Sequence, residues 1–322
     1  MSDAPLFHRL ALIGVGLIGS SIARAARAQR VTGTIVATAR SAATRRRVRE
    51  LGLADQVVET NAAAVGGADL VIVCIPVGQS GAVAEEIGPH LAPGAIVSDV
   101  GSVKASVLRD MAPHMPSGVH LIPAHPVAGT EHSGPDAGFA ELFVNRWCIL
   151  TPPPHADDVP VERLAAFWRA LGANVETMPA EHHDLVLAVT SHLPHLIAYT
   201  IVGTADELAE VTRSEVLKFS AGGFRDFTRI AASDPTMWRD VFLANKAAVL
   251  EILGRFNEDV ATLTRAIRRD DGETLFNLFT RTRAIRRGIV DIGQDSPAPD
   301  FGRAHASLPM APLPRPYAAD SE

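Results

Sequence analysis

The stretch "LALIGVGLIGSS" covers residues 10–21 and places Gly14, Gly16 and Gly19 in a G-x-G-x-x-G pattern directly after an apolar run. In this pattern the first glycine makes a tight turn, the second lets the backbone approach a pyrophosphate, and the third allows close helix–strand packing. The amides at the start of the following helix add positive potential. We therefore predict a strand, a turn and a helix, with Gly14, Gly16, Leu17, Ile18 and Gly19 at a dinucleotide cofactor.

Strand-like and helix-like stretches alternate through the first 178 residues. The apolar runs typical of strands are "RLALIG", "TIVATA", "LVIVCI", "AIVSDV", "VHLIP", "WCIL" and "ANVET". Amphipathic stretches of helical length, such as "VERLAAFWRAL", separate most of them. This alternation predicts βαβ units and a largely parallel sheet with helices on both faces. We therefore predict an α/β fold whose residues 1–178 form a Rossmann-type dinucleotide-binding domain.

The character of the sequence changes near Pro179, after which long helical patterns replace the strand signals. One helix is predicted to start at Asp234, a good N-cap, with Pro235 at its first position. Its apolar residues recur at spacings of three and four over about 30 residues, and Asn245 is the polar exception in that stripe. We predict an all-α C-terminal domain over residues 179–295 and a disordered tail, rich in Pro and Ala, over residues 296–322.

The composition is that of an ordinary globular protein of 322 residues, long enough for two domains. It is 47% apolar and 20% charged, and the net charge of −6 provides no general attraction for nucleic acid or anionic membranes. Cys74 and Cys148 both lie in apolar strand-like runs, so we expect no disulfide framework. No apolar run approaches the roughly 20 residues that span a bilayer. We therefore expect a cytoplasmic protein without nucleic-acid or membrane partners.

The end of the second predicted strand bears on the choice of cofactor. An acidic residue about 20 residues after the glycine pattern commonly binds the ribose 2′-hydroxyl of NAD. Here Ala39 takes that position, followed by Arg40 and Ser41, with Arg45 one turn further on. A 2′-phosphate needs donors and positive charge, which favours NADP, and NAD stays an alternative. Equally, these charges can belong to the solvated first turn of a helix and touch nothing.

Three predicted strands end in polar or turn-forming residues. Pro76 follows "LVIVCI", Ser102 follows "AIVSDV", and His125 follows "VHLIP". In open parallel sheets, ligands bind at the carboxyl ends of the strands, beside the nucleotide. A lone loop histidine is more often structural than catalytic, but one that meets a serine at this edge is a stronger catalytic candidate. We therefore place Pro76, Ser102 and His125 on the cofactor side of the sheet.

Four motifs resemble those of the prephenate and arogenate dehydrogenases. They are "GSVK" (101–104), "HPVAGTEHSG" (125–134), "SHLPH" (191–195) and "GGFRDFTRIAASDPTMWRD" (222–240), and the resemblance extends from Arg9 to Gly293. The stretches "HSGPDAGF" and "RWCILTPPP" look closest to bacterial cyclohexadienyl dehydrogenases. The resemblance implies NAD(P)-dependent oxidative decarboxylation in tyrosine biosynthesis, of prephenate to 4-hydroxyphenylpyruvate, of arogenate to tyrosine, or of both. It also implies a homodimer joined through the helical domain.

The resemblance implies roles for individual residues as well. His125 matches the family's catalytic histidine, which draws on the ring hydroxyl of the substrate as hydride leaves. Ser102 matches a serine that orients this histidine and touches the cofactor. Arg229 matches an arginine that binds a substrate carboxylate, and His195 matches a histidine of the substrate site. Thr130 and Glu131 match residues that line the substrate pocket.

Several of these residues have plainer interpretations. Arg229 could form an ion pair with Asp226 or Asp234, Glu131 could cap its loop, and Trp238 is better explained by the hydrophobic core than by a pocket wall. His192 and His195 are three residues apart, as in some metal sites. However, Pro194 lies between them and "EHHD" upstream offers no third ligand at a familiar spacing, so we expect no metal.

Two other functions remain as alternatives. One is a different two-domain dehydrogenase of the β-hydroxyacid or 6-phosphogluconate type, which relies on a catalytic lysine. Lys218 and Lys246 are the only lysines in the helical half, and neither lies in a pattern typical of those enzymes. The other is a non-catalytic dinucleotide-binding sensor. Loss of His125 or Arg229 would have favoured that function, but both residues are present.

Overall fold

The computed structural model describes residues 4–130, 132–207 and 222–291 of the chain. These described residues form two compact units, which divide between Arg265 and Ala266. The first unit holds both β-sheets and the helices from α1 to most of α12 (Lys246–Arg268). The second unit holds the end of α12 and α13 (Gly272–Asp291).

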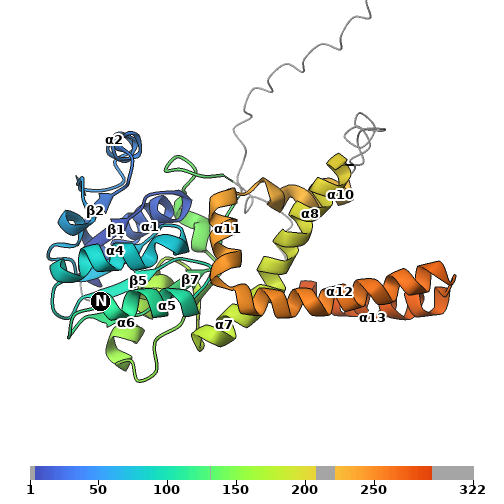
Figure 1. Cartoon of the computed structure of the whole chain (residues 1–322). Helices are drawn as coiled ribbons and strands as arrows, with labels where there is room; N and C mark the ends of the chain where they lie inside the picture. The colour runs from blue at the N-terminus through green and yellow to red at the C-terminus, as the bar shows by residue number, and fades with distance from the viewer. Residues whose placement is uncertain (1–3, 131, 208–221, 292–322) are drawn as a thin grey trace, which may run out of the picture. The chain divides into compact units, whose positions relative to one another are not determined.

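A six-stranded parallel sheet runs through the first unit (Figure 1), in the strand order β3-β2-β1-β4-β5-β6. Its strands are β1 (Phe7–Ile13), β2 (Thr32–Thr38), β3 (Gln56–Val57), β4 (Leu70–Val73), β5 (Ile96–Asp99) and β6 (His120–Leu121). The order reverses between β1 and β4, where doubly wound sheets bind nucleotides. The predicted parallel sheet, with a glycine-rich turn after its first strand, is therefore confirmed.

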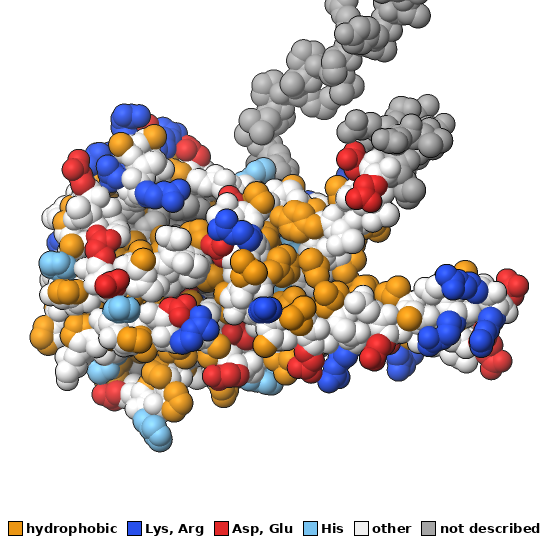
Figure 2. Space-filling view, in the orientation of Figure 1, with side chains coloured by type: hydrophobic (Ala, Val, Ile, Leu, Met, Phe, Trp, Pro, Cys, Tyr) orange, Lys and Arg blue, Asp and Glu red, His pale blue; other side chains and the backbone are white. Residues whose placement is uncertain are grey.

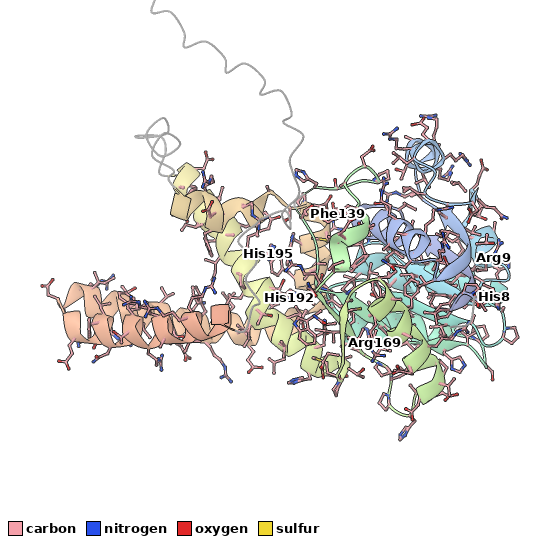
Figure 3. All side chains as sticks on the ribbon, turned by 180° about the vertical axis from the view of Figure 1, so that it is seen from behind. His8, Arg9, Phe139, Arg169, His192 and His195 are labelled. Carbon is pink, nitrogen blue, oxygen red and sulfur yellow. The ribbon has the colours of Figure 1, made fainter. Side chains whose placement is uncertain are left out.

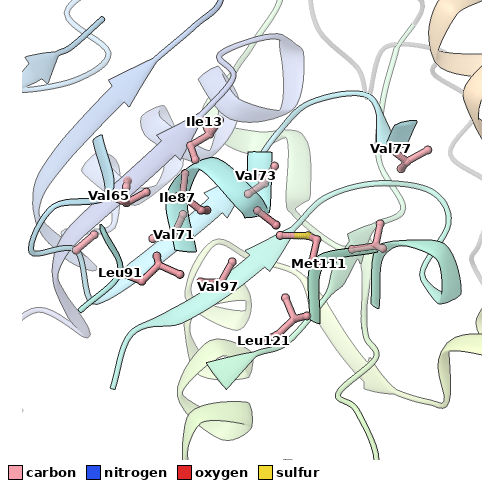
Figure 4. Close-up of a cluster of buried hydrophobic side chains, with 14 residues drawn as sticks. Ile13, Val65, Val71, Val73, Val77, Ile87, Leu91, Val97, Met111 and Leu121 are labelled. Atoms are coloured by element: carbon pink, nitrogen blue, oxygen red, sulfur yellow. The ribbon is translucent and has the colours of Figure 1, made fainter. Parts of the chain in front are cut away.

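Both faces of this sheet are buried. On one face Ile13, Val73 and Val97 pack against Met111 and other apolar side chains of the covering helices (Figure 4). Leu10 and Leu12 alternate with these residues, point to the opposite face, and are 0% exposed. Burial on both faces explains why β1 and β4 read as continuous apolar runs. The helices up to residue 170 are α1 (Leu17–Ala28), α2 (Ala42–Glu50), α3 (Asn61–Val65), α4 (Ser80–Ile87), α5 (Ala105–Met111) and α6 (Asp158–Ala170).

A second, three-stranded sheet carries the histidine that the sequence placed in a loop. It consists of β7 (Ala124–Pro126), β8 (Trp147–Leu150) and β9 (Asn174–Thr177), with β7 antiparallel to β8 and His125 opposite Ile149. The prediction of a loop at His125 was therefore wrong. The chain leaves β6 after Leu121 and pairs with a strand more than 20 residues later, which no local pattern indicates.

A continuous helical run leads out of the second sheet. It consists of α7 (Ala180–Leu187), a π-helical turn (Ala188–His192) and α8 (Leu193–Glu207). Pro194 has no N–H to donate to a preceding carbonyl, which accounts for the wider turn just before it. This run has a mean hydropathy of 1.6 over 18 residues, so it is long and apolar enough to span a membrane. It contains no uninterrupted apolar stretch of that length, which is why the sequence did not single it out. Core helices of soluble proteins also meet this criterion.

The predicted helix from Asp234 is broken in two. The described helices after residue 221 are α10 (Gly222–Thr228), a 3-10 turn (Arg229–Ala232), α11 (Pro235–Ala244), α12 and α13. Asp234 caps α11 as predicted, because its Oδ1 accepts the Met237 amide at 2.9 Å. The break falls at Asn245, whose side chain is buried and bonded elsewhere. The polar exception in the apolar stripe thus marks the end of one helix and the start of another.

The fold class is confirmed: a parallel-sheet domain is followed by a mostly helical part. The boundary at residue 178 stays a prediction. The tail at 296–322 lies outside the described residues, as does Lys218.

Candidate active site

The glycine turn between β1 and α1 fits a dinucleotide pyrophosphate. Gly14 has a φ of +89°, and a Cβ there would collide with the Cys74 carbonyl. A Cβ at Gly19 would collide with the Gly14 carbonyl, so the third glycine permits close packing of helix on turn. A Cβ at Gly16, in contrast, would meet no described atom within 4 Å. Gly16 caps α1 without a side-chain acceptor, and no acidic residue lies in the first turn, which leaves its amides to an anion.

The residues predicted to meet the ribose lie at the start of α2. Ala39 is buried just after β2, while Arg40 and Ser41 are exposed. Ser41 is the N-cap of α2, and its Oγ accepts the Thr44 amide at 3.0 Å. Arg45 folds back over the turn and donates to the carbonyls of Ala39 and Arg40, at 2.7 and 3.0 Å. The turn therefore presents two arginines and a hydroxyl, and no carboxylate, where a ribose would lie.

The segment after β7 returns to the dinucleotide helix. The Phe139 amide donates to Ser21 Oγ at 3.0 Å, and a Cβ at Gly138 would collide with Ser20 Oγ. Ser20 and Ser21 are both fully buried in α1. The segment at Gly138 and Phe139, which follows the strand of His125, thus packs directly on α1.

A buried ion pair, which the sequence did not indicate, bonds to the backbone of β7. Lys104 of the "GSVK" motif is fully buried, and its Nζ lies 2.5 Å from Asp99 Oδ2 and 2.7 Å from the Ala124 carbonyl. Asp99 also accepts the amides of Gly101 and Ala124, at 2.8 and 3.3 Å. Burial raises the pKa of Asp99 and lowers the pKa of Lys104, and each partner's charge opposes the other's shift. Both backbone groups of Ala124 are therefore held by this pair, one residue before His125.

His125 is the end of a chain of three buried side chains. Its Nδ1 lies 2.8 Å from His183 Nε2, and His183 Nδ1 lies 2.8 Å from Asp184 Oδ1. Burial, followed by the nearby His183 and the positive charge of Lys104, holds the pKa of His125 well below its usual value. His125 is therefore neutral near pH 7, as a hydrogen-bond acceptor must be.

A second group of rings follows along the π turn and α8, where His192 and His195 lie one turn apart (Figure 3). His192 is fully buried, its Nδ1 lies 3.1 Å from Asn245 Nδ2, and burial lowers its pKa to about 4. His195 bonds the Ser191 carbonyl through Nδ1 at 2.8 Å and stacks on Trp238, with ring centroids 3.6 Å apart. Trp238 is 6% exposed and packs on Val103, which confirms the prediction that it belongs to the core.

The remaining predicted residues are placed as follows. Arg229 is exposed in the turn after α10, and its charge lowers the pKa of His195, although burial is the larger cause of that shift. The ion-pair interpretation of Arg229 stays a prediction; Asp226 also pairs with Arg225 at 2.9 Å, and Asp234 caps α11. Thr130 is half-buried, and its Oγ1 accepts the His132 amide at 3.3 Å.

Pro76 is exposed after β4 and Ser102 is half-buried after β5, at the carboxyl edge of the sheet. Glu131 lies outside the described residues. No hydrogen bond among the described residues joins Ser102 to His125, so an orienting role for Ser102 stays a prediction. His183 Nε2 lies against His125 Nδ1 instead, and Asp184 lies behind His183. In the sequence, "EHHD" was considered only for metal ligands and offered none at a familiar spacing.

Comparison with known proteins supports the resemblance to prephenate and arogenate dehydrogenases along almost the whole chain. Residues 22–177 match the family model "Prephenate dehydrogenase, nucleotide-binding domain", and residues 179–281 match "Prephenate dehydrogenase, dimerization domain". The chain is 43% identical over 284 residues to the cyclohexadienyl dehydrogenase of Zymomonas mobilis, covering 88% of this chain and 97% of the relative.

Two solved structures are also similar. The prephenate dehydrogenase of Aquifex aeolicus, in complex with hydroxyphenyl propionate and NAD+, has a TM-score of 0.81 at 31% identity. That match covers 88% of this chain and 98% of the Aquifex chain. The arogenate dehydrogenase of Synechocystis has a TM-score of 0.72 at 26% identity, covering 87% and 99% of the two chains.

Proposed function

Since this chain belongs to the prephenate dehydrogenase family, we propose that it catalyses the NAD(P)-dependent oxidative decarboxylation of prephenate, arogenate or both. One observation carries this proposal beyond the family. His125 is buried and neutral, and the segment that follows its strand bonds to the dinucleotide helix through the Phe139 amide. An acceptor in that position can act on a substrate hydroxyl beside the nicotinamide.

The residues divide the chemistry between them. The nicotinamide, when bound, supplies the hydride acceptor. His125 accepts the proton of the ring hydroxyl as the carbon that bears this hydroxyl is oxidised to a carbonyl. Loss of the ring carboxylate as CO2 then makes the ring aromatic, which drives the reaction forward.

In this proposal, Arg229 and His195 bind the substrate. Arg229 binds a carboxylate, since its planar guanidinium suits a bidentate contact. His195 presents Nε2 to the substrate, because its Nδ1 already bonds the Ser191 carbonyl. Thr130, Glu131 and Ser102 complete the pocket, as the family resemblance implies.

For the cofactor, a nicotinamide dinucleotide follows from the family, and we propose a preference for NADP. Arg40 and the Ser41 hydroxyl lie beside buried Ala39, where an acidic residue would otherwise repel a 2′-phosphate. Arg45 braces the same turn through two carbonyls and adds positive charge.

For assembly, we propose a cytoplasmic homodimer, joined through a helical domain that starts at residue 179. The matched family model describes residues 179–281 as a dimerization domain. Hydrophobic side chains gather on the surface around α8 and α11 (Figure 2). Exposed apolar residues there are Ile201, Val202, Leu243 and Leu250. Contact between two copies would cover this surface, which also gives the apolar α7–α8 run a role other than spanning a membrane.

Steady-state kinetics of the purified protein, with both substrates against both cofactors, tests the proposal. We expect reduced cofactor, CO2 and 4-hydroxyphenylpyruvate from prephenate, and a higher kcat/KM with NADP than with NAD. Absence of turnover with every combination would contradict the proposed function, and a clear preference for NAD would contradict the assignment of Arg40 and Ser41.

A further inference from the structure

We infer that His183 and Asp184 are positioning residues that fix the tautomer of His125, with the proton on Nδ1 and an unprotonated Nε2 directed to the substrate. The inference rests on the proposed function only for its catalytic consequence. The tautomer itself is a property of the free protein.

The direction of the hydrogen bonds follows from the carboxylate at the end of the chain. An ionised carboxylate can only accept, so the proton between His183 Nδ1 and Asp184 Oδ1 belongs to His183. A neutral imidazole with a protonated Nδ1 has an unprotonated Nε2, so His183 Nε2 must accept from His125 Nδ1, 2.8 Å away. His125 then has no proton on Nε2. Each link fixes the next, and the chain ends at an unprotonated ring nitrogen, His125 Nε2.

The carboxylate is held so that it stays an acceptor. Asp184 Oδ1 accepts the Lys104 amide at 2.8 Å and Oδ2 accepts the Ala105 amide at 3.0 Å, at the start of α5. Asn245 Nδ2 donates to the Asp184 backbone carbonyl at 2.8 Å and fixes the main chain of the same residue. Both oxygens of Asp184 therefore already serve as hydrogen-bond acceptors. If His183 carried its proton on Nε2 instead, the lone pair of its Nδ1 would face a lone pair of Asp184 Oδ1.

A doubly protonated His125 is disfavoured by its surroundings. The side chain is 6% exposed, and the positive charge of Lys104 lies nearby, bonded to the carbonyl of the preceding residue. The lowered pKa values of His125 and His183, both caused mainly by burial, agree with two neutral rings. The protein thus builds the acceptor that hydride transfer requires before any substrate binds.

Asp184→Asn tests the direction of the chain. An asparagine can donate to His183 Nδ1, which would reverse both tautomers and place a proton on His125 Nε2. We expect kcat to fall by about 10²-fold or more, with KM changed less than about threefold. Asp69→Asn is the matched control, because Asp69 also accepts two consecutive amides, of His8 and Arg9, at 2.9 and 2.8 Å. It lies away from His125 and should leave kcat unchanged.

Imidazole 15N NMR of the substrate-free protein provides the second readout. Histidine labelling should show a protonated Nδ1 and an unprotonated Nε2 for His125 in the wild type, and the reverse in Asp184→Asn. A wild-type protein with the proton on Nε2, or a folded Asp184→Asn protein with unaltered kcat and tautomer, would overturn the inference. Because the NMR measurement needs no substrate, failure of the proposed activity would not be confused with failure of the tautomer assignment.

If Asp184→Asn does not fold, replacing His183 decides the question. His183→Gln can still accept from His125 Nδ1 through its amide oxygen, whereas His183→Leu cannot. We expect the Gln variant to keep at least about ten times the kcat of the Leu variant. Equal loss in both variants, with both folded, would contradict a role through the hydrogen bond.

Discussion

Lys104 and Asp99 form an ion pair inside the protein, with Nζ and Oδ2 2.5 Å apart and their side chains 0% and 3% exposed. The pair joins the carboxyl end of β5 to the start of α5 and holds the backbone of Ala124. It belongs to the framework that places His125. Its contribution can be measured as stability.

Lys104→Met should lower the free energy of unfolding by about 3–5 kcal/mol, since it leaves a buried carboxylate without its partner. Urea unfolding of the substrate-free protein measures this. Adding Asp99→Asn to Lys104→Met removes the isolated charge and should restore part of the loss. A double variant less stable than Lys104→Met would show that the unpaired charge is not the cause.

His125→Asn should reduce kcat by at least about 10²-fold, the usual contribution of an acid–base group, while the cofactor still binds. Steady-state kinetics and cofactor titration check both parts. His132→Asn, seven residues further along on an exposed position, is the matched control and should behave as the wild type. A His125 variant with the same kcat as that control would remove His125 from the mechanism.

The glycine turn offers a pair of variants with opposite expectations. Gly16→Ala places a methyl group in open space, so stability should change by less than about 1 kcal/mol while cofactor affinity falls. Gly14→Ala introduces a collision and a strained positive φ, so stability should fall as well. Thermal unfolding and fluorescence titration with the cofactor separate these effects. Undiminished cofactor binding by Gly16→Ala would place the pyrophosphate elsewhere.

Arg229→Ala should raise KM at least about tenfold with a smaller change in kcat, because a charged contact to a substrate carboxylate is lost. Arg225→Ala is the control, since Arg225 pairs with Asp226 on the exposed face of α10. Steady-state kinetics of both variants measures the two KM values. The same KM for both variants would favour a purely structural ion pair for Arg229.

Acid should destabilise the protein before most carboxylates titrate. His125, His183, His192 and His195 all have pKa values lowered mainly by burial. Between each lowered pKa and the ordinary value near 6.5, the unfolded chain binds a proton that the folded protein does not. Stability is therefore lost as the pH falls below about 6.5.

His192, with a pKa of about 4, contributes about 3 kcal/mol of this loss by pH 4. Urea unfolding from pH 8 to pH 5 should show the decline. A flat profile would mean that these histidines are protonated in the folded protein.

The parts of the fold set by local constraints were predictable from sequence. The glycine turn, the apolar strands and the cap at Asp234 each depend on residues within a few positions of one another. The same is not true of β7, which exists because Ala124 is bonded to Lys104 and Asp99 and pairs with β8. The end of an apolar run indicated Ser102, but no local pattern indicated that Lys104 would be buried beside Asp99.

The chain behind His125 was beyond local reasoning for the same reason. Asp184 accepts an amide 80 positions earlier, and His183 meets a ring 58 positions earlier. Asn245 was the one signal present in the sequence. A polar residue in an apolar stripe needs a buried partner, and here it has two, His192 and the Asp184 carbonyl.

The contact of Gly138 with Ser20 also constrains how this protein can change. Any side chain at position 138 would collide with Ser20 Oγ, and the neighbouring amide of Phe139 already uses Ser21. A smaller residue at 20 would not relieve this, because the new Cβ would still lie 2.9 Å from the Ser21 backbone nitrogen, so substitution at 138 requires this turn of α1 to move. A designer who regrafts the loop after His125 would have to carry over the matching turn of α1 as well.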